Sequence, residues 1–455
     1  MDTRRVWRTA RIFALLSLSG ADLAGAQDSN YWSIAYGTRS QLLGGVVVGS
    51  PGDISATYYN PGALALTQST ELLLAGNAYQ YQSVSVDNGS GPGRKLASSS
   101  IAAVPSLFAG EIPILEKSRL AYAFLTRRSM DMKIESHSTT GVDGIVPIAN
   151  PVFSAAEVQL KQDFDEGWYG MTWARPLSPT LGFGISPFLM VRSQHTTAAL
   201  LTEGRDASDQ AAILNQRREY DYMHWSLLAR IGLSGMRDSL TYGITLTTPN
   251  LGVTGSGNTS YNTTLIDQTG TIGNIVGADY QEKLKATYRT PFGAAAGASY
   301  GFGATRLHAT VDWYAEVPRY TVLETPEFTV RTPSGDSTVK VVISDELRDV
   351  LNWGVGFEHR FSETVVGFAS YHSDRSARVE GAPPSASVTR WNLNHLAAGA
   401  TWHVWRSDLA LGISTAFGSQ ETPPLPPSPD GGVAPGILQT HETLITVILG
   451  WKISF

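Results

Sequence analysis

The sequence predicts an all-β fold: a transmembrane antiparallel β-barrel of about 14 strands with an N-terminal hatch (plug) inside the lumen. Three observations predict this fold. Only 16% of the residues are charged, whereas soluble domains average about 25%. After the first 26 residues, no apolar run approaches the ~20 residues that a membrane-spanning helix needs. Apolar and polar residues also alternate along most of the chain, as they do in strands that face lipid on one side.

Residues 1–26 have the pattern of an export signal, the first of three predicted segments. Four arginines precede a short apolar run at 12–18, and small residues lie around Ala26, where cleavage is expected. The alternative is a disordered basic tail. We therefore expect an exported protein in the outer membrane of a Gram-negative-type cell, with a hatch at 27–66 and a barrel at 67–455.

Composition excludes several kinds of function. The net charge of −6 at pH 7 does not favour nucleic acid as a partner. The chain has no cysteine, which excludes disulfides and thiolate chemistry. Its nine histidines are scattered, and no sequence motif of a hydrolase, a metalloprotease or a phosphate-binding loop occurs. The sequence therefore predicts no enzyme, no metal and no cofactor.

Fourteen strands follow the hatch. We expect them at 69–86, 98–112, 118–134, 155–177, 180–198, 217–236, 239–252, 280–302, 305–317, 350–361, 363–375, 390–405, 408–420 and 441–455. Tight turns alternate with long connections, which is typical of outer-membrane barrels with turns on the periplasmic side. The last strand is the clearest, because every second residue from Thr443 to Phe455 is apolar or threonine.

The hatch is expected around the stretch from Asp53 to Leu66. Asn60-Pro61 interrupts this stretch, because the residue before a proline is driven out of the helical region. We expect Asp53, Asn60, Pro61 and Gly62 to gate the barrel, with Asn60-Pro61 as the moving elbow. The alternative is an ordinary turn before the first strand.

Two of the long outer loops are unusually apolar, and exposed apolar clusters usually mark interaction sites. We expect them to capture a ligand, or alternatively to pack on each other as a lid. The candidate residues are Ile145, Val146, Ile148, Val152, Phe153, Leu200, Leu201, Ile213 and Leu214.

Basic residues on the polar faces of two predicted strands are candidate contacts for the head group of an amphipathic acid. Arg218 and Arg230 belong to the strand at 217–236. Lys283, Lys285 and Arg289 belong to the strand at 280–302. The alternative is plain solvation of the lumen. The small residues that follow Pro291 either bend this strand or admit something close to the wall, and the bend is favoured.

The pattern as a whole resembles the FadL/TodX family of outer-membrane transporters for long-chain fatty acids and hydrocarbons. The resemblance rests on the signal, the glycine-rich stretch 37–45, the run Asn60-Pro61-Gly62-Ala63, the fourteen strands and the terminal Phe455. The family has alanine where this chain has Gly62. The resemblance implies a hatch, capture of ligand at the outer loops and a lateral exit near a kinked third strand. The predicted third strand contains neither glycine nor proline, so its sequence indicates no kink.

The resemblance also implies an assembly signal at Trp451 and Phe455, read by the barrel-assembly machinery. The function expected from it is passive uptake of a hydrophobic small-molecule ligand across the outer membrane, with membrane lipid as a further partner. Two alternatives stay open. One is a barrel whose surface loops mediate binding or adhesion. The other is a barrel lipid hydrolase with a Ser-His pair formed across the wall.

Overall fold

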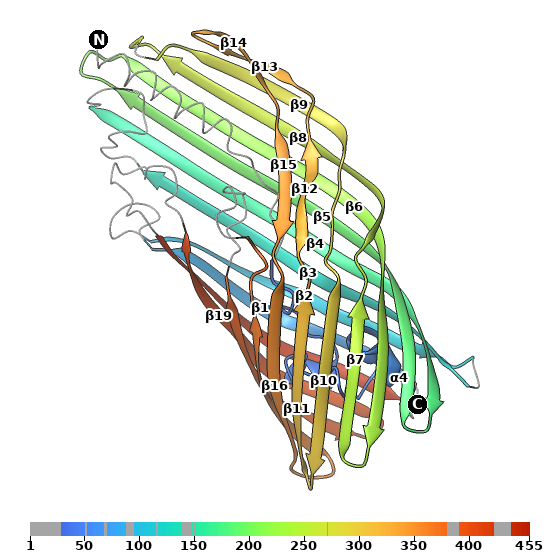
Figure 1. Cartoon of the computed structure of the whole chain (residues 1–455). Helices are drawn as coiled ribbons and strands as arrows, with labels where there is room; N and C mark the ends of the chain where they lie inside the picture. Colours follow the sequence, from blue (N-terminus) through green and yellow to red (C-terminus); the bar gives the residue numbers. More distant parts are fainter. Residues whose placement is uncertain are drawn as a thin grey trace.

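The computed structural model describes residues 29–50, 52–67, 71–87, 95–114, 117–138, 148, 152–270, 272–379, 391–422 and 438–455. Their strands form one closed antiparallel barrel with three short helices inside it (Figure 1). None of the helices in this part of the chain is long and apolar enough to cross a membrane.

Twelve strands occupy one wall position each. They are β1 (Glu71–Val86), β2 (Leu96–Ile112), β3 (Arg119–Ser138), β4 (Phe153–Ser178), β5 (Leu181–Arg205), β6 (Ala211–Arg237), β11 (Thr305–Tyr314), β16 (Val350–Arg360), β17 (Val365–Asp374), β18 (Leu393–Val404), β19 (Ser407–Thr422) and β20 (Leu438–Ser454). The barrel closes because β1 pairs with both β2 and β20.

Two further wall positions are filled by interrupted strands. Both β7 (Leu240–Thr247) and β8 (Leu251–Asp267) pair with β6, one along each half of it. In the next position, β9 (Ile275–Lys285) pairs with β8, and β10 (Gly293–Phe302) pairs with β7 and β11. The described wall therefore has 14 positions, which confirms the predicted number.

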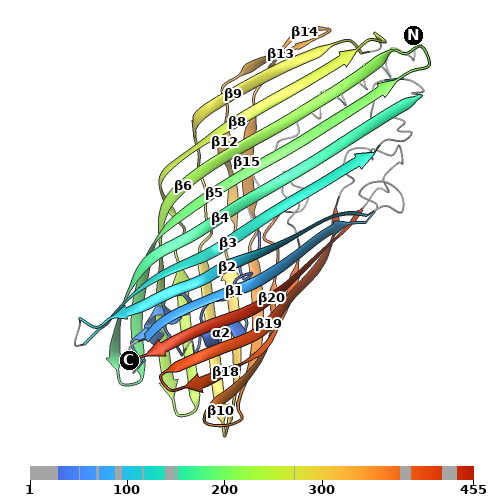
Figure 2. The same ribbon diagram turned by 180° about the vertical axis from the view of Figure 1, so that it is seen from behind.

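Three neighbouring strands are much longer than predicted and extend the wall at one end of the barrel. Strands β4, β5 and β6 have 26, 25 and 27 residues, whereas crossing a bilayer takes about 9–11. The regions 199–216 and 253–279, which we expected to be loops, are therefore mostly extensions of the wall (Figures 1 and 2). Alternation alone did not predict this, because apolar residues occur on both faces of the extensions, as Leu200 and Leu201 do on β5.

The connection between β11 and β16 is also folded, although we expected a loop there. It contains β12 (Val317–Glu324), β13 (Phe328–Thr332), β14 (Gly335–Val339) and β15 (Val342–Leu347). Strands β12 and β15 form a separate two-stranded sheet, while β13 and β14 form a hairpin beside β9.

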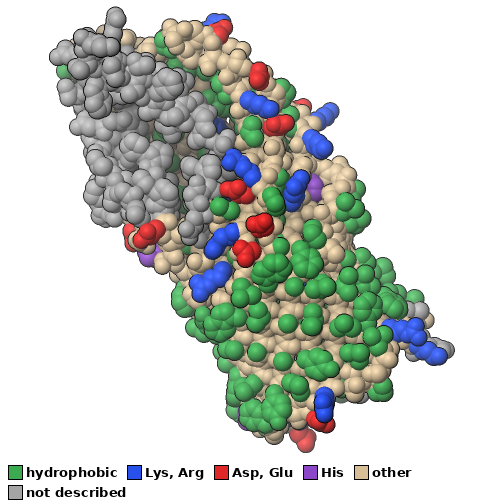
Figure 3. All heavy atoms as spheres, in the orientation of Figure 1, with side chains coloured by type: hydrophobic (Ala, Val, Ile, Leu, Met, Phe, Trp, Pro, Cys, Tyr) green, Lys and Arg blue, Asp and Glu red, His purple; other side chains and the backbone are tan. Residues whose placement is uncertain are grey.

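The outer face carries a belt of apolar side chains. On β19, Leu409, Leu411 and Ile413 are exposed, whereas Ala410 and Ala416 on the opposite face are buried. In the view of Figure 3, hydrophobic side chains cover the lower half of the barrel, and Lys, Arg, Asp and Glu gather on the upper half. Exposed leucine and tryptophan at this density require an apolar surrounding, so the lower half is the membrane-spanning part.

Part of the wall between β2 and β3 is unpaired, and we call this part the seam. The ladder between β2 and β3 ends at the pair Leu107 and Leu125, so residues 96–106 and 126–138 do not pair with each other. A register shift in β3, between Thr126 and Arg128, directly follows the last pair. A bulge can bend its strand without glycine or proline, so neither residue marks this position in the chain.

The lipid-facing register of β19 can be tested with Leu411→Arg. Leu411 is 48% exposed on the outer face, and an arginine near the bilayer midplane costs about 2–4 kcal/mol. We expect the free energy of unfolding in lipid bilayers to fall by that amount, and Leu411→Met to change it little. Equal stabilities of the two variants would show that the register is wrong.

Candidate functional site

The N-terminal segment, residues 29–67, lies inside the lower half of the barrel. Its helices are α2 (Thr38–Leu42), α3 (Ala56–Tyr59) and α4 (Pro61–Leu64). Helix α2 contacts β17–β20 and β1, while α4 contacts β4–β7 on the other side of the lumen. Figures 1 and 2 show the segment enclosed by these strands. The side chains of Leu42, Leu43 and Ile54 are completely buried.

Asn60 both starts helix α4 and holds it to the wall. Its backbone is extended, as expected before proline, and its Oδ1 accepts a hydrogen bond of 3.1 Å from the backbone N of Gly62. Its Nδ2 donates to the carbonyl oxygens of Val48, at 3.0 Å, and of Leu233 on β6, at 2.9 Å. These three hydrogen bonds of the Asn60 side chain hold the turn in place.

Glycines in the wall make room for the segment. A Cβ on any of them would lie 3.0 Å or less from an atom of the segment, which is tighter than nine in ten real Cβ contacts. These wall glycines are Gly182 and Gly184 on β5, Gly232 on β6, Gly243 on β7, Gly297 on β10, Gly354 and Gly356 on β16, Gly399 on β18, Gly412 on β19 and Gly450 on β20. The segment therefore packs directly against the wall backbone.

The same close approach explains two features of the sequence. A Cβ on residue 62 would lie 2.6 Å from the carbonyl oxygen of Gly232 and 2.7 Å from that of Gly182, so glycine fits here where alanine would not. A Cβ on Gly297 would lie 2.7 Å from the backbone N of Gly49. At Gly297 the small-residue run therefore admits the segment close to the wall, which was the alternative to the favoured bend.

Ion pairs tie the segment to the wall at the end opposite the long strands. The guanidinium of Arg39 bonds Glu358 on β16 through Nε at 3.0 Å, and its Nη1 donates to the carbonyl oxygen of Ser50 at 2.7 Å. The ring of His308 on β11 lies between Glu358 and Ser50. Its nitrogen atoms are 3.2 Å from Oε2 of Glu358 and 2.9 Å from Oγ of Ser50.

Asp53 is buried within the segment, with little to compensate its charge. Its Oδ1 accepts a hydrogen bond of 2.8 Å from the backbone N of Ser55, whereas its Oδ2 has no hydrogen-bond partner. Burial raises the pKa of this carboxyl group, and Ser55 and Lys452 oppose the shift. The following residue, Ile54, donates its backbone N to Glu71 on β1 at 3.0 Å, which joins the segment to the first strand.

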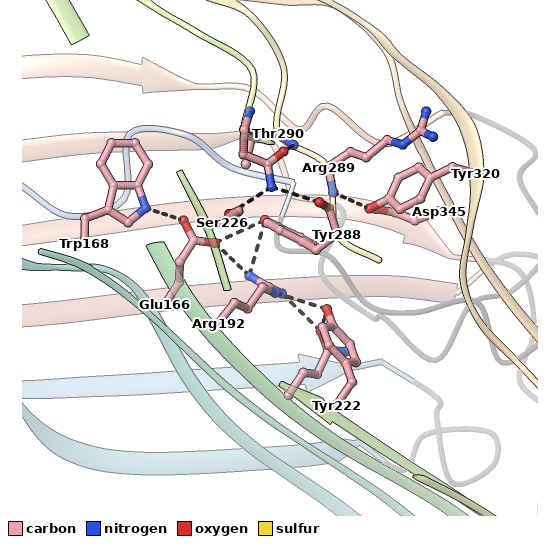
Figure 4. A network of polar contacts seen from close by, with 12 residues as sticks. Glu166, Trp168, Arg192, Tyr222, Ser226, Tyr288, Arg289, Thr290, Tyr320 and Asp345 are labelled. Carbon is pink, nitrogen blue, oxygen red and sulfur yellow. Dashed lines mark hydrogen bonds and ion pairs between the residues drawn. The ribbon is translucent and has the colours of Figure 1, made fainter. Parts of the chain in front are cut away.

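A buried polar network crosses the lumen beside the segment (Figure 4). Arg192 on β5 and Glu166 on β4 form an ion pair of 3.1 Å and are almost inaccessible to solvent. The hydroxyl groups of Tyr222 and Tyr288 and the indole N–H of Trp168 complete their hydrogen bonding. Sequence reasoning missed Arg192 and Glu166, although the alternation on β4 and β5 assigns both to the inner face.

An aromatic cluster joins this network to the segment. The ring of Tyr58 lies 4.4 Å from that of Tyr36 and 6.0 Å from that of Trp168, measured between centroids. The guanidinium of Arg230 lies 4.2 Å from the Tyr58 centroid, and that of Arg127 lies 6.0 Å from it. Arg230, a predicted head-group contact, therefore faces the lumen next to the segment.

The other predicted head-group contacts lie elsewhere. Arg218 is half-buried over the ring of Tyr261, higher in the lumen. Lys283, Lys285 and Arg289 are exposed, and their assignment to the lumen face is wrong.

A bulge explains this error. Lys283 has a φ of 56°, and the ladder between β8 and β9 shifts register nearby. A bulge adds one residue and reverses the faces beyond it. The even-numbered residues Leu284, Ala286 and Tyr288 therefore turn inward.

The predicted ligand-capture residues do not form one cluster in the described structure. Ile145 and Val146 lie outside the described residues. Leu200 and Leu201 belong to β5, and Ile213 and Leu214 to β6, so none of them is on a loop. Leu214 and Leu200 pack in a cluster with Tyr261 and Val330. Ile148 packs against Ala212. The remaining four residues are exposed: Val152, Phe153, Leu201 and Ile213.

The predicted assembly signal consists of Trp451 and Phe455, and both side chains are exposed.

An apolar cluster lies in the upper lumen beside the unpaired seam. It consists of Val84, Val86, Met130, Met132, Ile134, Phe164, Trp391 and Leu393. Three of these residues come from β3, along the part that β2 does not pair with. A cavity of about 60 Å³ borders the cluster at Met130, Phe164 and Trp391 and extends to Ile34 of the N-terminal segment. No group of His, Asp and Glu among the described residues could hold a metal ion.

These features define a closed fourteen-stranded barrel with an N-terminal segment packed in its lumen, and solved structures share this fold. A Pseudomonas aeruginosa FadL homologue has a TM-score of 0.57 and 12% identity, covering 94% of this chain and 100% of that chain. The toluene transporter TodX of P. putida has a TM-score of 0.57 and 12% identity, covering 92% and 99%. The toluene transporter TbuX of Ralstonia pickettii has a TM-score of 0.55 and 11% identity, covering 92% and 98%. No protein-family model and no curated protein matches the sequence. The likeness confirms, at the level of the fold, the resemblance seen in the sequence.

The packing of the segment against wall glycines can be tested with Gly232→Ala. The added Cβ would overlap Oδ1 of Asn60 and lie 2.8 Å from Cδ of Pro61. Overpacking costs about 1–3 kcal/mol, which is roughly 5- to 150-fold in an opening equilibrium. A cysteine introduced at the buried Ala56 should therefore react with a water-soluble maleimide faster in the Gly232→Ala variant than in the wild-type background, by that factor. Gly301→Ala is the matched control, because its Cβ would meet only the end of the Arg306 side chain at 3.3 Å. Equal labelling rates in both variants would contradict the packing argument.

A second prediction concerns Asp345 on β15, whose Oδ2 accepts a hydrogen bond of 3.3 Å from Tyr320 on β12. Burial raises the pKa of Asp345 from 3.8 to about 7, although Arg378 opposes the shift. Because the folded state binds this proton more tightly than the unfolded chain, the β12–β15 sheet loses stability as the pH rises from about 4 to about 7. The loss should reach at most about 4 kcal/mol.

Hydrogen exchange of residues 317–347, corrected for intrinsic rates, measures this effect. Protection should be lower at pH 8 than at pH 5 in the wild type, and Asp345→Asn should remove the difference. Asp336→Asn, at an exposed position, should preserve it. A pH dependence that survives Asp345→Asn would assign the effect to another group.

Proposed function

We propose that this protein takes up hydrophobic small molecules passively across an outer membrane, and that the N-terminal segment acts as the hatch that gates it. The cargo class is long-chain fatty acids, lipids or hydrocarbons. The proposal includes export through the predicted signal, cleavage near Ala26 and insertion by the barrel-assembly machinery. The main support for this proposal is that the N-terminal segment fills the lower lumen, while an apolar cluster in the upper lumen lies beside the unpaired part of the wall between β2 and β3.

The filled lumen argues against a general porin. A fourteen-stranded barrel is wide enough to leave a water-filled channel unless something occupies it. Here the N-terminal segment is buried against the wall on both sides, and the Arg192–Glu166 network lies beside it. The described residues of the lower lumen thus occupy the space that a porin leaves open to ions and polar solutes.

The unpaired seam supports a lateral route for apolar cargo. A molecule in the upper lumen would contact Met130, Met132 and Phe164 and then pass between β2 and β3, where no ladder closes the wall. Leaving sideways keeps an apolar molecule in contact with apolar surface throughout. Solved structures of similar fold include the monoaromatic hydrocarbon channel CymD and the P. putida toluene transporter TodX.

Gating requires the segment to move, and its contacts suggest which part does. The turn at Asn60–Gly62 is held by hydrogen bonds and by the glycines of β5, β6 and β7. We therefore place the moving part in residues 29–50 and treat Asn60-Pro61 as its anchor. Two left-handed glycines, Gly44 and Gly45, lie in this part and supply a natural bend.

Uptake of radiolabelled palmitate by cells that express the protein tests the function. The proposal predicts saturable uptake above that of cells with an empty vector. Binding at the cell surface without uptake would instead indicate an adhesion barrel, and turnover of a lipid ester by the purified protein would indicate a hydrolase.

Gating can be tested with an engineered disulfide between Thr38→Cys and Gly450→Cys. A Cβ placed on Gly450 would lie 3.4 Å from the Cβ of Thr38, close to the ~3.5–4.5 Å that a disulfide needs. The chain has no cysteine of its own, so no other bridge can form. Oxidation should tether α2 to β20 and suppress palmitate uptake, and reduction should restore it. Thr38→Ser with Gly450→Cys is the control. Undiminished uptake by the bridged protein would show that this part of the segment does not gate.

A further inference from the structure

We propose that His372 on β17 and His395 on β18 form a pH-sensitive latch, which holds the start of the N-terminal segment against the wall at neutral pH and releases it in acid. This inference rests on the proposed gating by the segment and adds a condition that controls it. It arises from a column of three stacked rings that joins the segment to the wall.

The column consists of Trp32 on the segment, followed by His372 and His395. The ring centroids of Trp32 and His372 are 4.9 Å apart, and those of the two histidines are 4.2 Å apart with an angle of 13° between the ring planes. All three residues are at most 6% exposed. Nε2 of His372 also lies 3.1 Å from the carbonyl oxygen of Trp32. The start of the segment is therefore held by stacking and by a hydrogen bond.

The contacts of the column suit two neutral rings. Because a carbonyl oxygen only accepts, Nε2 of His372 carries the hydrogen, and Nδ1 is the nitrogen that would take up a further proton. This Nδ1 packs against Gly44 of the segment, where a Cβ would lie 2.9 Å from it. On His395, Nε2 has no hydrogen-bond partner within the described part of the chain. An imidazole in water takes up a proton near pH 6.5, but two positive charges at the separation of these rings repel each other strongly where water is scarce.

The nearest acid, Asp374 on β17, links the histidines to the segment. Its Oδ2 lies 3.9 Å from Nε2 of His395. The same oxygen accepts a hydrogen bond of 3.0 Å from Oγ of Ser33, and Oδ1 accepts one of 3.0 Å from the backbone N of Tyr31. A protonated His395 would therefore compete with the segment for this carboxylate.

The other charged groups around the start of the segment do not favour a charged pair of histidines. Arg127 on β3 donates a hydrogen bond to the carbonyl oxygen of Tyr31, and the guanidinium of Arg128 lies 4.8 Å from the centroid of the Tyr31 ring. Glu442 on β20 accepts a hydrogen bond of 2.7 Å from β1. Two cations thus contact the segment here, which makes additional positive charge less favourable.

A small cavity gives protons access to the latch. It has a volume of about 30 Å³ and is bordered by Trp32 and Gly44 of the segment, by both histidines and by uncharged side chains of β18, β19 and β20. This space is sufficient for a water molecule, which can deliver a proton to Nε2 of His395. Uptake of protons at the column then favours the state in which the rings have separated and the segment has left the wall.

Hydrogen exchange of residues 29–36 between pH 8 and pH 5, corrected for intrinsic rates, measures the release of the latch. The full-length barrel is studied in nanodiscs. An opening that takes up one proton increases up to tenfold per pH unit as the pH falls, and one that takes up two protons increases up to 100-fold. We expect the steeper dependence in the wild type. His395→Phe keeps a ring in the column but cannot take up a proton, so the dependence should fall to tenfold per pH unit or less.

His441→Gln is the matched control, since His441 is half-buried on β20 and its Nε2 lies 3.1 Å from Asp87. It should keep the wild-type dependence, and heat-modifiable migration on gels confirms that each variant is folded. Exchange that does not change with pH in the wild type would overturn the inference without needing any variant to fold, and so would equal slopes in the wild type and His395→Phe. Either result would leave the uptake function standing, because palmitate uptake is measured separately. The expected slopes in a protein that takes up no palmitate would support the latch and remove the proposed function.

Discussion

The structure depends on the close packing of the N-terminal segment against the backbone of the barrel wall. Ten glycines on β5, β6, β7, β10, β16, β18, β19 and β20 lack the Cβ atoms that would otherwise occupy the space of the segment. At Gly182, Gly184 and Gly297 the nearest atom of the segment belongs to its backbone, and at Gly354, Gly356, Gly399, Gly412 and Gly450 it belongs to a side chain. The segment is therefore in close contact with the wall on several sides of the lumen.

The remaining features of the lumen fit around this contact. Asn60 fastens one end of the segment to β6, and the Arg39–Glu358 pair fastens its middle to β16. Above it, the lumen divides into a polar side, with Arg192 and Glu166, and an apolar side, next to the unpaired edges of β2 and β3. Arg230 and Tyr58 lie where the segment meets the polar side. Under the proposed uptake function, cargo in the upper lumen would meet both the segment and the seam.

Much of this fold could be predicted from the sequence because it follows from local patterns. Period-two alternation predicted the 14 wall positions, and Asn60-Pro61 marked the turn that begins α4. The errors arose where one residue changes the pattern. The bulge at Lys283 reversed the faces of the residues that follow it, and the register shift at Arg127 lies beside the seam in a strand without glycine or proline. The role of the wall glycines depends on contacts between distant parts of the chain, such as Gly412 with Leu42, which no local pattern records.

The central claim, that the N-terminal segment fills and closes the barrel, is tested most directly by single-channel conductance in a planar lipid bilayer. The mature full-length chain and a variant lacking residues 27–66 would be compared under the same voltage and salt. The account predicts almost no ion current through the full chain and a stable open pore in the truncated barrel. Equal currents through the two proteins would contradict it.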